Sequence, residues 1–159
     1  MMETADIIAL VDIAVSAGFG VWIATAITKS QTKERFLKDY FTNELNSIKD
    51  DCKSFFDEVC YDKKRAKDIK IGFKLLSMRI AAFETNLNGA FKKINCQLAQ
   101  HLKNIQLEIT GSDDFNNQFK EEAVSFSPDE KNAILESRHK LLTEFSTSVI
   151  TINKASLKR

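Results

Sequence analysis

The chain has 159 residues, with five Gly, one Pro and a formal net charge of +1. So few chain-reversing residues argue against an architecture of many short strands and turns, and they favour long helices. The nearly neutral balance gives no reason to expect binding to double-stranded DNA. Three cysteines without a CxxC spacing argue against a disulfide framework and fit a reducing compartment.

The first long apolar segment, residues 7–28, contains a single charged residue, Asp12. As a helix it would extend about 33 Å, which is enough to cross the hydrocarbon core of a bilayer. Acidic residues precede it and Lys29 begins a basic stretch after it, the reverse of the order in a cleaved signal peptide. We therefore predict an uncleaved single-pass transmembrane helix.

The charges on either side of this segment predict its orientation. All 23 Lys and Arg residues follow Thr28, whereas three of the 22 acidic residues precede it, so the chain after Thr28 has a net charge of +4. The positive-inside bias then places the N-terminus outside and the remainder in the cytoplasm. We expect a transmembrane anchor over residues 1–29, in the inner (plasma) membrane, and a cytoplasmic helical domain over residues 30–159.

Small or polar side chains recur every fourth residue along the expected membrane helix, at Asp12, Ser16, Gly20, Ala24 and Thr28. Such a stripe lets two helix backbones approach closely in lipid, and an intramembrane acid usually faces a bundle interior. The pattern favours a homo-oligomer that associates through Asp12, Ser16, Gly20 and Ala24. The alternative is that Asp12 lies close enough to the surface to be hydrated and that the small residues are incidental.

Beyond the membrane segment, the pattern predicts a helix from Ser30 to about Tyr61 that continues the membrane helix. Its apolar residues are spaced alternately four and three apart, as in a coiled-coil seam. These residues are Leu37, Phe41, Leu45, Ile48, Cys52, Phe55 and Val59.

A second helix is expected to start near Ala66, and its apolar seam extends to Ile109. Asn88 and Gly89 offer a break, because Asn-Gly suits a helix C-cap or a turn. With the break, two helices fold back as a hairpin; without it, one helix forms a long stalk. The apolar seam alone does not decide between the hairpin and the stalk.

The remaining signals are helix caps. Gly111 closes the second seam, and Ser112, Asp113 and Asp114 offer N-caps for a short helix that holds Phe115, Phe119 and Val124. In Ser127-Pro128-Asp129-Glu130, Ser127 is an N-cap and Glu130 completes a capping box for a last helix, which runs to about Asn153. The polar tail 154–159 is expected to fray. The fold class is therefore all-α: one N-terminal transmembrane helix followed by a cytoplasmic helical bundle with coiled-coil-like seams.

The strongest local charge bias lies between Tyr61 and Lys74. Several cations close together can neutralise phosphates, and a neighbouring aromatic side chain can stack on a base. The alternatives are solvation of a helix end, attraction to anionic lipid and ion pairs with the acidic segment from Asp113 to Glu130. Attraction to lipid is weaker here, since thirty helical residues, about 45 Å, separate the cluster from the bilayer. The candidate phosphate ligands are Lys63, Lys64, Arg65, Lys67 and Lys70.

Residues for catalysis are scarce. His101 and His139 lack partners at metal-ligand spacing, and no phosphate-binding loop or nucleophile motif occurs. Cys60 beside Tyr61 could be an activated thiol, but burial on the helix seam is the better interpretation. We expect no enzyme activity, no cofactor and no metal site.

Taken together, the expected membrane helix at residues 7–28 and the basic cluster at 63–74 resemble, in layout, the small membrane effectors of type III CRISPR systems. The resemblance extends over the whole chain. It implies a cytoplasmic domain that binds a cyclic oligoadenylate, oligomerises and makes the membrane segment damage the host membrane, as antiviral defence by abortive infection. The alternative function is a passive membrane-tethered helical adaptor or scaffold that recruits another protein.

Overall fold

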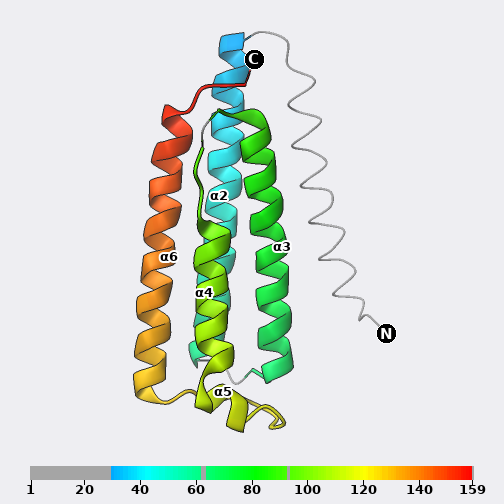
Figure 1. Cartoon of the computed structure of the whole chain (residues 1–159), viewed down its shortest axis with the longest axis vertical. Helices are drawn as coiled ribbons and strands as arrows, with labels where there is room; N and C mark the ends of the chain where they lie inside the picture. The colour runs from blue at the N-terminus through cyan, green and yellow to red at the C-terminus, as the bar shows by residue number, and fades with distance from the viewer. Residues whose placement is uncertain (1–29, 62–63, 93, 159) are drawn as a thin grey trace, which may run out of the picture.

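The computed structural model describes residues 30–61, 64–92 and 94–158, and over these residues the protein is all-α. The helices are α2 (Ser30–Tyr61), α3 (Ala66–Ala90), α4 (Leu98–Gly111), the short α5 (Asp113–Asn117) and α6 (Pro128–Lys154). Helices α2 and α4 lie diagonally opposite, and each packs against both α3 and α6 (Figure 1). The fold is an up-and-down four-helix bundle in which successive helices are antiparallel.

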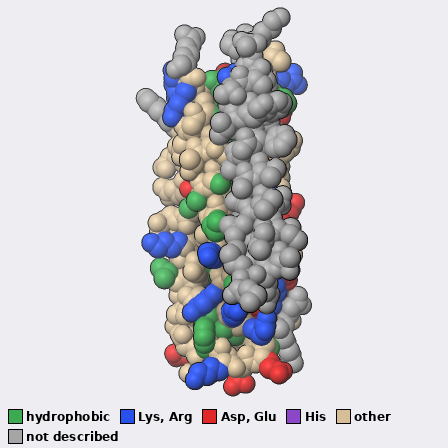
Figure 2. All heavy atoms as spheres, turned by 90° about the vertical axis from the view of Figure 1, so that its right-hand side faces the viewer, with side chains coloured by type: hydrophobic (Ala, Val, Ile, Leu, Met, Phe, Trp, Pro, Cys, Tyr) green, Lys and Arg blue, Asp and Glu red, His purple; other side chains and the backbone are tan. Residues whose placement is uncertain are grey.

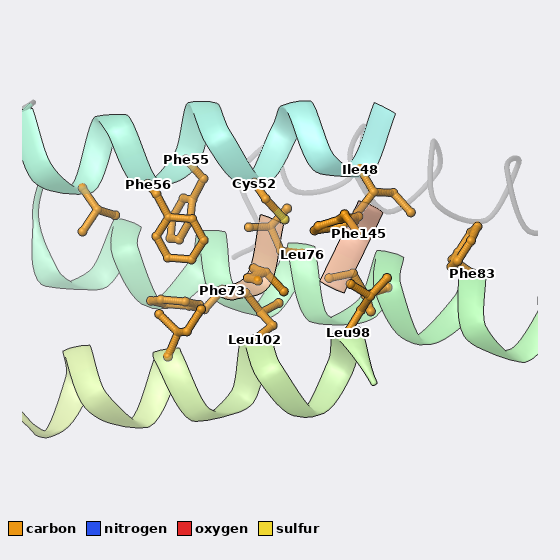
Figure 3. Packing of buried hydrophobic residues seen from close by; sticks show 14 of the residues in the cluster. Ile48, Cys52, Phe55, Phe56, Phe73, Leu76, Phe83, Leu98, Leu102 and Phe145 are labelled. Carbon is orange, nitrogen blue, oxygen red and sulfur yellow. The ribbon is translucent and has the colours of Figure 1, made fainter. Parts of the chain in front are cut away.

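The predicted apolar seam of α2 is confirmed, because all seven of its residues are buried in the core. In the middle of the bundle, Cys52 of α2 and Leu76 of α3 point toward the interior that Leu102 of α4 also fills (Figure 3). Edge-to-face aromatic contacts strengthen the packing; the ring centroids of Phe55 and Phe73 are 4.9 Å apart.

The second seam is interrupted, so the hairpin alternative is correct and the stalk is not formed. The break lies after Asn88-Gly89, since α3 continues to Ala90 and Phe91 has extended backbone. The Phe91 ring remains in the core, 1% exposed and 5.7 Å from the ring of Phe41. This buried side chain lets the chain leave the helix without opening the core, and α4 starts only at Leu98.

The C-terminal tail is paired, and the prediction that it frays is wrong. The Lys92 N–H donates to the Ser156 carbonyl at 2.9 Å, and the Lys158 N–H donates to the Ala90 carbonyl at 3.0 Å. These two bonds form an antiparallel bridge between Phe91 and Leu157. The bridge closes the end of the bundle at which α2 begins (Figure 1).

The predicted helix starts are confirmed, but the extent of α5 and the capping box need correction. Helix α5 ends at Asn117, so Phe119 and Val124 lie outside the short helix that was expected to hold them. Ser112 caps α5 by accepting from the Phe115 N–H, and Ser127 accepts from the Glu130 N–H at 3.4 Å. The reciprocal half of the capping box is wrong, because the Ser127 N–H donates to Asp114 Oδ2 at 2.8 Å. This hydrogen bond lowers the pKa of Asp114 and joins α5 to the start of α6.

The predicted membrane segment, residues 7–28, lies outside the described residues, as do Asp12, Ser16, Gly20 and Ala24 of its stripe. The predicted continuity between that segment and α2 lies there too. Within the described part of the chain, none of the helices is both long and apolar enough to span a bilayer.

The close packing of α2 on α3 generates a stability prediction at Gly72. A Cβ atom at this position would lie 2.2 Å from Cε2 of Phe55, whose ring is held against Phe56 and Phe73. Gly→Ala normally stabilises a helix interior by about 1 kcal/mol. Overpacking reverses the sign here, so we expect Gly72→Ala to destabilise the full-length protein by about 1–3 kcal/mol in thermal unfolding followed by circular dichroism.

The matched control is Gly89→Ala, also in α3, where an added Cβ meets nothing within 4 Å. This substitution should raise the midpoint of thermal unfolding slightly, because the helix propensity improves and nothing clashes. Equal effects of the two substitutions would contradict the packing of Phe55 over Gly72.

Candidate anion-binding site

The basic cluster lies where α2 ends and α3 begins, at the lower end of the bundle in Figure 1. Helix α2 has 32 residues and therefore carries this end about 48 Å from its own start. The loop between α5 and α6 lies against the cluster, since the Val124 N–H donates to the Lys64 carbonyl at 2.8 Å. The α5 region thus forms one wall of the candidate site.

Arg65 occupies the N-cap position of α3 with extended backbone, and its side chain does not cap the helix. Its guanidinium donates two hydrogen bonds to Asp68, from Nε at 2.8 Å and from the Nη2 nitrogen at 3.1 Å. These bonds are the main reason that the pKa of Asp68 is lowered. The Arg65 side chain is still 62% exposed, so a ligand can reach it from solvent.

The other predicted ligands differ in their surroundings. Lys64 forms an ion pair with Glu58 of α2. Lys70 lies 4.5 Å from the ring centroid of Phe119, within the range of a cation–π interaction. Lys67 is exposed and has no ion pair within the described part of the chain. Lys63 lies outside the described residues.

One alternative that the sequence left open, ion pairs between the cluster and the acidic segment, is not seen among the described residues. The ion pairs of Lys64 and Arg65 run to Glu58 and Asp68, which belong to α2 and α3. Among the described residues, no ion pair joins the cluster to the segment from Asp113 to Glu130.

Sequence reasoning missed the aromatic residues beside the cluster. Lys70 also lies 5.7 Å from the ring of Phe115, which is buried, whereas Phe119 is 45% exposed. The available signal was the pair Phe115 and Phe119 in a short segment that had to fold against some neighbour. Which helix end it would cover depends on the turn after α4, and no local pattern specifies that turn.

This arrangement is suited to bind phosphate groups. Lys64, Arg65 and Lys67 surround the N-terminus of a 25-residue helix, which carries a partial positive charge. Exposed ion pairs contribute about 0–1 kcal/mol, so a phosphate can replace Asp68 or Glu58 at low cost. Tyr61, 66% exposed at the end of α2, offers a ring on which a base can stack.

The cysteines are poor nucleophiles. Cys60 is 3% exposed, and burial raises the pKa of its thiol. Burial likewise raises the pKa of Cys52 to about 12. The expected burial of Cys60 on the seam is therefore confirmed. In the described part of the chain, no three His, Cys, Asp or Glu side chains are grouped so that they could hold a metal ion.

Neither protein-family models, nor curated proteins, nor solved structures match this chain.

The raised thiol pKa values predict protection from alkylation. At pH 8 the native protein should react with iodoacetamide at Cys52 and Cys60 at least about 100-fold more slowly than in denaturant, because the reactive thiolate is suppressed and access is blocked. Peptide mass spectrometry of the full-length protein measures both rates. Rapid labelling of Cys60 in the folded protein would contradict its burial and restore it as a candidate nucleophile.

Proposed function

We propose that the chain is a membrane-anchored, homo-oligomeric effector whose cytoplasmic bundle binds a phosphorylated signal at the start of α3. The candidate signal is a cyclic oligoadenylate, and the response is loss of membrane integrity in antiviral defence. One observation carries the proposal: the bundle places the basic cluster at the end opposite the start of α2, which follows the predicted anchor. A cluster about 48 Å from that start is open to a soluble ligand and remote from lipid.

The chemistry of the ligand class fits this end of the bundle. A cyclic oligoadenylate carries one phosphate and one adenine per nucleotide, so it needs cations and stacking surfaces that repeat. Each chain supplies Arg65 and Lys67 as cations, with Tyr61 exposed beside them. A homo-oligomer repeats this set around its symmetry axis and creates a site that one chain lacks.

Ion pairs between helices support transmission of binding along the bundle. Arg79 of α3 bonds to both Glu44 and Asp51 of α2, and Arg138 of α6 donates to Asp57 of α2 at 2.7 Å. Helix α2 is thus tied to both of its neighbours along its length. A ligand that reorients the bundle therefore reorients α2, and with it the packing of the stripe in the predicted membrane helix.

The adaptor alternative is favoured by exposed apolar side chains. Leu107 of α4 is 60% exposed and Phe119 is 45% exposed, and both lie at or near the end of the bundle that carries the basic cluster. A recruited protein could contact them. The two functions differ in whether an anionic ligand binds at all.

Charge reversal in the cluster tests the ligand site. We expect Arg65→Glu combined with Lys67→Glu to weaken binding of cyclic oligoadenylates by at least about 100-fold, because two charge-assisted contacts are lost in every subunit. Filter binding with the full-length protein in detergent measures the affinity. Added salt should weaken binding to the unmodified protein.

The matched control is Lys103→Glu with Lys140→Glu, an equal charge change on exposed positions of α4 and α6. It should bind like the unmodified protein, and circular dichroism should show that both variants are folded. Retained binding by the folded Arg65/Lys67 variant would move the site elsewhere. If no cyclic oligoadenylate binds the unmodified protein, the adaptor function becomes the better proposal.

The membrane stripe has its own prediction. Gly20→Ile should weaken association of the membrane helices, because a bulky β-branched side chain holds the two backbones apart. Chemical crosslinking in membranes should show fewer oligomers, while Val21→Ile, which lies off the stripe, leaves them unchanged. An unaltered crosslinking pattern in both variants would argue against the stripe as an interface.

A further inference from the structure

We propose that the end of the bundle at which α2 begins binds anionic lipid headgroups. This inference rests on the membrane anchor of the proposed function and is independent of the phosphorylated ligand. We call this surface the basic end. Its cations come from the start of α2, from the connection after α3 and from the end of α6 and the C-terminal tail; they are Lys33, Arg35, Lys38, Lys92, Lys154 and Lys158.

The fold brings these three segments together although they are far apart in the sequence. The bridge between Phe91 and Leu157 places Lys92 opposite Ser156 and Lys158 opposite Ala90, so the two lysines belong to one small patch, at diagonal positions across the bridge. Lys38 Nζ donates to the Asn153 carbonyl at 3.0 Å and so joins α2 to the last turn of α6. The start of α2 and the C-terminal tail both lie at the upper end in Figure 1.

The basic end carries an unbalanced positive charge. The only acidic residues among its described segments are Glu34 and Asp39, and Glu34 is paired with Lys38 at 2.8 Å. None of the other five cations has an ion pair with a described residue. At the opposite end the charges are mixed, and Figure 2 shows acidic and basic side chains together around the lower end.

The position of the basic end, next to the predicted membrane helix, favours lipid as its partner. The predicted membrane helix ends at Thr28, and the sequence predicts that it continues into α2. In that arrangement Lys33 and Arg35 would lie roughly 8–11 Å from its end, about one Debye length. Basic residues this close to an anionic leaflet contribute about 1 kcal/mol each. Phe36 is 43% exposed at the same end, and an aromatic ring suits the membrane interface.

The shape of the surface argues against a small soluble anion. The groove between α2 and α6 at this end is lined by residues of both charges, and Lys38 within it is already engaged by Glu34 and by Asn153. The free cations instead lie on three separate segments. A bilayer meets such a surface with many headgroups at once, so lipid binding would hold the bundle upright with its basic end on the membrane.

The test uses the only Trp in the chain, Trp22, which lies within the predicted membrane helix. The full-length protein is reconstituted in vesicles of equal parts phosphatidylcholine and phosphatidylglycerol, with one lipid at a time carrying brominated acyl chains. Because bromine quenches Trp fluorescence only at short range, the ratio of the two quenching efficiencies gives the local excess of the anionic lipid. We expect phosphatidylglycerol to be preferred at least about threefold at low salt and the preference to vanish in 1 M salt.

The decisive variant replaces Lys92, Lys154 and Lys158 with Gln, because the fold alone brings these three cations to the membrane. It should lose at least about half of the lipid preference. A control with the exposed residues Lys103, Lys120 and Lys140 replaced by Gln has the same net charge and should keep the preference. The bridge that holds the tail consists of backbone hydrogen bonds, so it survives the Gln substitutions, and circular dichroism checks the fold.

The outcomes separate this inference from the proposed function. If the unmodified protein remains in membranes after an alkaline wash but shows no preference for phosphatidylglycerol, lipid binding by the basic end is overturned and the effector proposal stands. Lipid binding by the basic end is also overturned if the decisive variant and the control variant retain the lipid preference equally, or lose it equally. If the alkaline wash releases the protein, the anchor is overturned, and lipid binding with it.

Discussion

Burial of one face of α2 is the interaction on which the other helices depend. Its core residues, from Leu37 to Cys60, are nearly inaccessible to solvent over about six turns. Each large apolar side chain contributes about 1.5–3 kcal/mol by leaving water, whereas an exposed ion pair contributes at most about 1 kcal/mol. The apolar seam therefore holds α3 and α6 against α2, and the ion pairs of Arg79 and Arg138 at its margins select the register of the helices rather than supply their stability.

Much of the fold could be predicted from the sequence because its signals are local. The spacing of Leu37, Phe41 and the rest of the seam predicted α2, and the candidate caps at 112–114 and at Ser127 marked two helix starts. The end of α3 could not be decided, because Phe91 satisfies the apolar seam whether it is helical or extended. The pairing of Leu157 with Phe91 is a contact between distant segments, and a polar tail carries no pattern that identifies its partner.

For the candidate site, the sequence found the charges but not their surroundings. Composition alone located Lys64, Arg65 and Lys70. Asp68, three residues after Arg65, was visible in the sequence, yet its bidentate bond depends on the side-chain geometry at the start of α3. The rings near Lys70 come from Phe115 of α5 and from Phe119 just after it, about fifty residues later in the chain, and only the tertiary fold reveals this contact.

The two ends of the bundle carry cations in different settings, and this difference suggests how they divide their roles. At the start of α3, Lys64 and Arg65 form ion pairs with Glu58 and Asp68, so an anionic ligand would have to compete with these carboxylates. Several phosphate groups that bind together would gain enough binding free energy to do so, whereas a single phosphate would not. At the basic end, most cations have no acidic partner among the described residues, which suits a weak, multivalent and persistent contact with a charged surface. Because α2 spans both ends, such a contact would hold one end of this helix on the membrane, while the other end would be the one that the proposed ligand contacts.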